Sequence, residues 1–199
     1  MENKKVELTK GMQEKVSAIE VAKANVRTVS ADIVESQEVA QVALSALEAE
    51  LADKKEEKAS ATDIVLAKKV AKEVAEIEEN IELQLGVNEA VLTQKKVDLD
   101  EALTELLNAT KSARFFFTAV EAEYKATVSL RSLKEDTATL QAFASTVNQA
   151  TSYAVQSLVK FGFIEQKDTS SSYKGVHLGS SPCHSRLETV FTPDARRGY

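Results

Sequence analysis

The side chains with the greatest chemical potential lie close together near the C-terminal end of the sequence. His177, Cys183 and His184 fall within a few residues of one another, and they include both histidines and the only cysteine of the 199-residue chain. A structural zinc site needs four ligands, and an adjacent Cys-His pair does not have a zinc-finger spacing. A Cys-His nucleophile pair would need a third group to orient its base, and none is evident. We therefore predict no metal site and no catalytic site here.

The motifs of common enzyme classes are also missing from the sequence. It contains no Gly-rich phosphate loop, no dinucleotide fingerprint, no His-Glu-x-x-His and no Gly-x-Ser-x-Gly. The many glutamates suggest a carboxylate-bridged metal bundle, but that site uses Glu-x-x-His pairs on its helices, and no histidine precedes His177. We predict that the protein is not an enzyme and that it uses no cofactor.

The composition indicates helices packed along narrow seams. Hydrophobic residues make up 43% of the chain and charged residues 28%, but aromatic residues are only 6%, tryptophan is absent, and alanine and valine supply much of the apolar share. Small apolar residues at helical spacing favour thin contacts between helices over a thick core, so we expect an elongated molecule. The net charge of −6 disfavours nonspecific nucleic-acid binding, which depends on lysine and arginine.

The start of the sequence, Met-Glu-Asn-Lys-Lys, leads into no apolar core of a signal peptide. No apolar run approaches the roughly 18 residues that span a bilayer. The sequence-based expectation is a cytoplasmic protein, or a component of a particle that is assembled inside a cell.

Apolar residues recur at helical spacing over most of the chain. A first row has steps of seven, as in a helix that faces a partner helix: Met12, Ile19, Val26, Ile33, Ala40 and Leu47. A second row repeats the step with leucine alone: Leu85, Leu92, Leu99 and Leu106. A third row, from Leu130 to Phe161, alternates steps of three and four, and Gly162 follows it as a C-terminal glycine commonly does.

These rows predict an all-α fold of long helices, arranged as an elongated helical hairpin or a three-helix coiled-coil bundle. We place the chain reversals near Lys55 and Lys111, with Gly86 as an alternative site for a kink or reversal, and a continuous helix through residues 53–58 remains open. The stretch from Ser60 to Asp63 fits the N-cap of the second helix.

Two features on the helices are candidates for interaction sites. Asn88 and Lys95 fall where leucine is expected, and they either fix the register of a helical seam or point to water. Phe115, Phe116 and Phe117 point in three directions on a helix, so they form either a core corner or a docking patch for another protein or a membrane.

The amino-acid composition changes after Gly162. We therefore divide the chain into a helical domain, residues 1–162, and a non-helical C-terminal arm, residues 163–199. The arm contains both prolines and two short β-like runs, Tyr173–Leu178 and Leu187–Thr192. It is a disordered tail, a small hairpin, or an arm that adds a strand to the sheet of a partner, and an arm of this kind would contact a neighbouring subunit. The candidate contact residues in it are Tyr173, Val176 and Leu178, with Arg196 and Arg197 facing an acidic partner.

The leading hypothesis is therefore a non-enzymatic structural or assembly protein of a large complex, such as a virion. Its expected partners are other protein subunits, including copies of itself, rather than nucleic acid or membrane. Two alternatives remain: a membrane-acting, pore-type protein that exposes the Phe115–Val120 patch, and a cytosolic helical adaptor.

Overall fold

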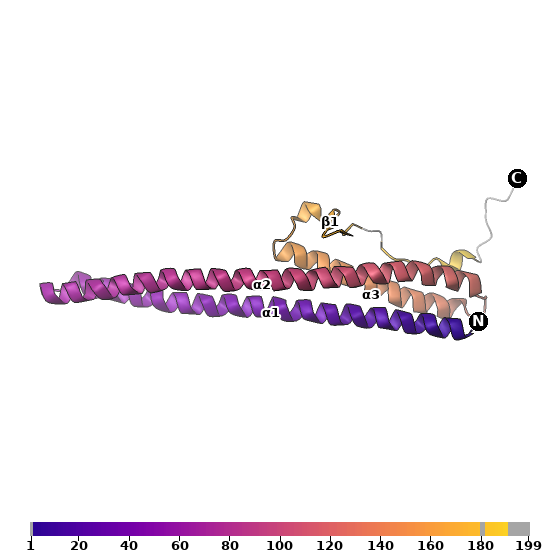
Figure 1. Ribbon diagram of the computed structural model, residues 1–199, viewed down its shortest axis with the longest axis horizontal. Coiled ribbons are helices and arrows are strands. Elements are labelled where there is room, and N and C mark those ends of the chain that lie inside the picture. The colour runs from indigo at the N-terminus through magenta and orange to yellow at the C-terminus, as the bar shows by residue number, and fades with distance from the viewer. Residues whose placement is uncertain (1, 180–181, 191–199) are drawn as a thin grey trace. The chain divides into compact units, whose positions relative to one another are not determined.

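The computed structural model describes residues 2–179 and 182–190, and it confirms the predicted all-α class (Figure 1). Three long helices come first in the described chain: α1 (Glu2–Ser60), α2 (Ile64–Thr127) and α3 (Leu133–Lys160). The C-terminal arm then contains the 3-10 helix η1 (Gln166–Asp168), the strands β1 (Ser172–Tyr173) and β2 (Val176–His177), and the 3-10 helix η2 (Leu187–Val190).

Packing contacts group the chain into two units. The first unit consists of residues 1–26 and 100–199, and the second consists of residues 27–99. Both α1 and α2 run through the two units, whereas α3 and the described part of the arm belong to the first. The sequence composition placed a domain boundary at Gly162, between the helices and the arm. In the structure the described part of the arm instead packs in one unit with α3 and parts of α1 and α2.

The first unit is a three-helix bundle formed by α3 and the neighbouring ends of α1 and α2. Phe117 of α2 packs on Phe143 of α3, with ring centroids 6.2 Å apart. Lys23 of α1 lies over the ring of Tyr153 of α3, 5.2 Å from its centroid. The predicted rows supply the bundle core, in which these side chains are fully or almost fully buried: Met12, Ile19, Val26, Leu106, Leu140, Val147, Ala154 and Leu158.

The end of α3 confirms the prediction made from Gly162. This glycine has φ +76°, a conformation that costs other residues energy. Its N–H donates to the carbonyl of Val159 at 3.1 Å, and the N–H of Phe163 donates to the carbonyl of Leu158 at 2.9 Å. These two bonds are the Schellman pattern, which satisfies carbonyl groups left free at a helix end.

The predicted reversal near Lys111 is wrong, because α2 continues to Thr127 and the chain reverses at residues 128–132. The residues that suggested a turn fit inside the helix, since the Thr110 hydroxyl donates to the carbonyl of Leu107 at 2.8 Å. The apolar stripe of α2 also continues through Ala113 and Val120, both fully buried. Packing therefore outweighs the local turn preference.

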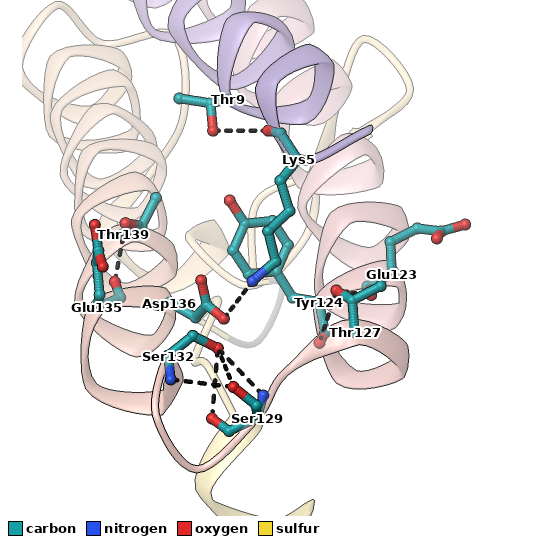
Figure 2. Close-up of polar contacts among 10 residues, drawn as sticks. All are labelled: Lys5, Thr9, Glu123, Tyr124, Thr127, Ser129, Ser132, Glu135, Asp136 and Thr139. Atoms are coloured by element: carbon teal, nitrogen blue, oxygen red, sulfur yellow. Dashed lines mark hydrogen bonds and ion pairs between the residues drawn. The ribbon is translucent and has the colours of Figure 1, made fainter. Parts of the chain in front are cut away.

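Figure 2 shows the reversal that joins α2 to α3. Ser129 and Ser132 exchange hydrogen bonds through their backbone N–H groups and hydroxyls, at 3.2–3.3 Å. Beside the turn, the Lys5 ammonium of α1 contacts the buried Asp136 carboxylate of α3 at 2.7 Å and lies over the ring of Tyr124 of α2. These contacts join the three helices at this end of the bundle.

The first reversal lies at residues 61–63, a few positions beyond the predicted site at Lys55. The stretch predicted to cap α2 does so, but through Asp63 rather than Ser60: the Asp63 carboxylate accepts the backbone N–H of Val65 at 3.0 Å. The alternative reversal at Gly86 is not found, because α2 is helical on both sides of this residue.

Two helical glycines have opposite surroundings. A Cβ atom added to Gly11 would lie 2.5 Å from the tip of the Phe116 ring, which packs edge-on against Phe143. A Cβ atom added to Gly86 would meet nothing within 4 Å. Gly11 therefore leaves the space that the Phe116 ring occupies, whereas no atom of the described chain occupies the space beside Gly86.

We expect opposite effects from alanine at these two glycines. Gly86→Ala should raise the free energy of unfolding by up to about 1 kcal/mol, because alanine is the better helix former. Gly11→Ala should lower it despite the same gain, because the Phe116 ring must move off Phe143. Urea unfolding followed by circular dichroism measures both. Equal stabilisation by the two substitutions would show that the Phe116 ring yields without cost.

Candidate interaction surfaces

Much of the helical pair in the second unit has no buried residue. No side chain is buried in residues 34–69 or in residues 78–98, all of which are described, whereas Val70, Val74 and Ile77 between these segments are buried. The predicted leucine row shows the change: Leu99 and Leu106 are fully buried, Leu92 is half-buried and Leu85 is 50% exposed. The prediction that Leu85 belongs to this seam is therefore wrong.

Small and polar side chains explain this open seam. Ala40 and Asn88 lie between α1 and α2 where larger apolar residues would close the contact, and both are half-buried. Lys95 also occupies a predicted seam position. Its Nζ atom donates to the carbonyl of Asp32 on α1 at 3.3 Å. The structure therefore places Asn88 and Lys95 toward α1, as the register interpretation requires, and their interaction role stays a prediction.

Two grooves follow this part of the seam, with volumes of about 460 and 630 Å³. Ala40, Asn88 and Leu92 line both grooves, so the seam between them is thin. The Asn88 Oδ1 atom accepts from the Gln84 amide at 2.9 Å, but its Nδ2 atom is shielded from solvent and has no hydrogen-bond partner in the described chain. A buried amide donor without an acceptor is costly.

Ion pairs hold the helices together nearer the first reversal. Lys54 contacts Glu73 at 2.8 Å, and Lys55 contacts Glu78 at 2.9 Å. Hydrogen bonds to Glu57 and Glu73 raise the pKa of Lys54, and the bond from Lys54 is the main cause of the lowered pKa of Glu73. Because Lys54 and Glu73 are only half-buried and Lys55 and Glu78 are exposed, these pairs orient the helices more than they stabilise them.

The three phenylalanines divide between the core and the surface. Phe117 is buried and Phe116 is half-buried, both against Phe143, whereas Phe115 is 69% exposed. Val120 is fully buried, so residues 115–120 do not form the continuous apolar surface on which the membrane alternative depended. Among the described residues, no helix is long and apolar enough to cross a membrane.

The arm docks on helices of its own chain. The Tyr173 hydroxyl and the Lys174 ammonium both donate to the carboxylate of Asp100 on α2. The Asn148 side chain of α3 forms two hydrogen bonds of 2.9 Å with the backbone of Cys183. Two further arm residues that the sequence singled out, Val176 and Leu178, are buried within the first unit.

The predicted β-like runs have different outcomes. Tyr173 pairs with Val176 in a two-residue hairpin whose turn, Lys174-Gly175, has positive φ at both positions. The described part of the second run, Leu187–Val190, forms the 3-10 helix η2 instead of a strand. Arg196 and Arg197 lie outside the described residues.

A cleft of about 500 Å³ lies between α2 and the arm. His177, Cys183 and His184 all line it, but no group of three metal-binding side chains is close enough to hold an ion among the described residues. Burial raises the pKa of the Cys183 thiol, Arg114 lowers it and Glu121 raises it, and the balance is upward. The thiol is therefore protonated near neutral pH, which weakens it as a nucleophile.

Sequence reasoning missed Asp100 as the residue that receives the arm. Its partners Tyr173 and Lys174 are more than 70 positions away, and no local pattern connects such distant residues. Compared with known proteins, the chain matches no family model, no curated protein sequence and no solved structure.

The contact between Asp100 and the hairpin is expected to depend on pH. Partial burial would raise the pKa of Asp100, but hydrogen bonds from Lys174 and Tyr173 outweigh this effect and lower it. Because the pKa of Asp100 is lower in the folded state, its stabilisation is fully present when the pH is above the unfolded-state pKa of about 3.9. The stabilisation is lost as the pH falls from there through the folded-state pKa. Asp100→Asn should therefore weaken hairpin docking by about 1 kcal/mol at pH 7 and by less at pH 3.

Hydrogen exchange of the amides of residues 172–178 measures this docking. Asp98→Asn is the matched control, because Asp98 is exposed and accepts only from its helical neighbour Gln94 in the described chain. An equal effect of Asp100→Asn at both pH values would contradict an electrostatic contact.

Proposed function

We propose that this protein is a non-enzymatic structural component of a larger protein assembly, and that its second unit packs against helices of a neighbouring subunit. The observation that carries the proposal is the helical pair of the second unit, in which residues 34–69 and 78–98 contain no buried side chain and only Val70, Val74 and Ile77 between them are buried. We define these two segments as the open section. Its apolar side chains require a cover that its own two helices do not provide.

The exposed valines and leucines of the open section make the association favourable. Val39, Val42, Leu83, Leu85 and Val87 are each at least half exposed. Fully burying one such side chain contributes roughly 1.5–3 kcal/mol, so covering several of them offsets the entropy lost on association. A standard protein interface buries about 800 Å² on each partner, which a helix laid along this section can supply.

We expect the subunit interface in the open section rather than in the C-terminal arm, because the arm residues already pack within their own chain. Tyr173, Val176 and Leu178 already make contacts with α2 or with other parts of the first unit. The described part of the arm therefore supports the bundle of its own chain. A large particle such as a virion is the setting in which we place this function.

Size fractionation of cells that produce the protein tests the proposal. The native chain should sediment with a high-mass complex, and the double variant Val42→Lys/Val87→Lys should move to the light fractions. These two side chains are 70% and 57% exposed, so lysine at either site should leave the helices folded. Val21→Lys is the control, since Val21 is 69% exposed in the first unit. A native chain found only in light fractions would contradict the proposal.

A further inference from the structure

One groove of the open section has the features of a self-complementary surface. The groove of about 630 Å³ has Leu44 on its α1 side and Leu85 and Leu92 on its α2 side, with Glu89 and Lys96 beside them. We call it the Leu92 groove. Its two charged residues have opposite signs, and its remaining polar residues are neutral.

The α2 residues of the Leu92 groove form a single stripe. Leu85, Glu89, Leu92 and Lys96 follow one another at steps of four, three and four, which places them on one face of the helix. Glu89 and Lys96 are both exposed, and no ion pair joins either of them to another side chain in the described chain. Apolar side chains and unpaired charges therefore alternate along this stripe.

We propose that the Leu92 groove binds a second copy of this chain, with the two α2 helices antiparallel across a two-fold axis near Leu92. This inference rests on the proposed function and names its partner. In an antiparallel pair centred between Leu92 and Thr93, Glu89 of each copy faces Lys96 of the other. Leu92 of each copy then faces Leu92 of the other copy across the axis.

The charges select this orientation over the parallel one. A parallel pair would place Glu89 against Glu89 and Lys96 against Lys96, and like charges at an interface are repulsive. The antiparallel pair contains two attractive contacts instead, and its two-fold symmetry closes this interface at two copies. Asn88 also lines this groove, and a polar residue at a helical seam can fix the register of the pairing.

Charge reversal in the purified full chain tests the pairing. Glu89→Lys or Lys96→Glu creates two like-charge contacts in each dimer, so each variant should raise the dimer dissociation constant about tenfold. The double variant Glu89→Lys/Lys96→Glu restores both attractive contacts and should return the constant to within about twofold of the native value. Sedimentation equilibrium measures the constant, and circular dichroism checks that each variant is folded.

Glu48→Lys is the matched control, because Glu48 is an exposed acidic residue of the open section outside the Leu92 groove. It should leave the dissociation constant unchanged. A dimer that is insensitive to both single reversals, or a double variant that does not recover, overturns the proposal. A chain that stays monomeric at high concentration also overturns it, whereas the cell fractionation still decides whether the open section binds a different subunit.

Cysteine cross-linking tests the orientation independently, in a Cys183→Ser background that removes the only native thiol. Thr93 lines the groove next to the proposed axis, so Thr93→Cys should form a disulfide-linked dimer on mild oxidation. Leu85→Cys should not, because antiparallel helices place the two copies of residue 85 about 22 Å apart along the helix axis, whereas a parallel in-register pair would place them together. Efficient cross-linking at residue 85 would overturn the antiparallel register.

Discussion

The structure depends on how many helices are available to cover an apolar stripe. The apolar stripe of an amphipathic helix is too wide for a single partner helix to cover fully, unless large side chains fill the contact between them. In the first unit α3 adds a third surface, and Val26, Leu106 and Val120 are completely shielded from solvent. In the second unit only α1 and α2 are present, with Ala40 and Asn88 at their contact, and the flanking leucines stay partly exposed. The difference in burial follows from helix number and side-chain size together.

The first unit resolves several local conflicts in favour of packing. Thr110 lies in a stretch whose residue types prefer turns, yet its hydroxyl bonds back to the helix and α2 continues. Gly11 weakens its helix locally, but it leaves the space that the Phe116 ring occupies. The arm adds polar contacts through Asp100 and Asn148 to the same unit. Each local cost is offset by a contact with a distant part of the chain.

The second unit has the opposite character, because several of its polar and charged groups have no partner within the described chain. Among the described residues, the Asn88 side-chain NH2 group has no hydrogen-bond acceptor, and Glu89 and Lys96 form no ion pair. In a monomer these features cost stability or contribute nothing. In an assembly they would select a partner and its orientation, which is a known role of polar residues at helical seams.

The sequence by itself determined the helical class, the seam positions from Met12 to Ile33, the row from Thr137 to Leu158, and the helix end at Gly162. These depend on spacing and on local backbone conformation, which a single segment carries. Only the tertiary structure decided that α2 continues past Lys111, that Leu85 leaves the seam, and that Asp100 receives Tyr173 and Lys174. Those outcomes depend on which distant surfaces meet, and contacts between residues tens of positions apart leave no periodic signal in the sequence.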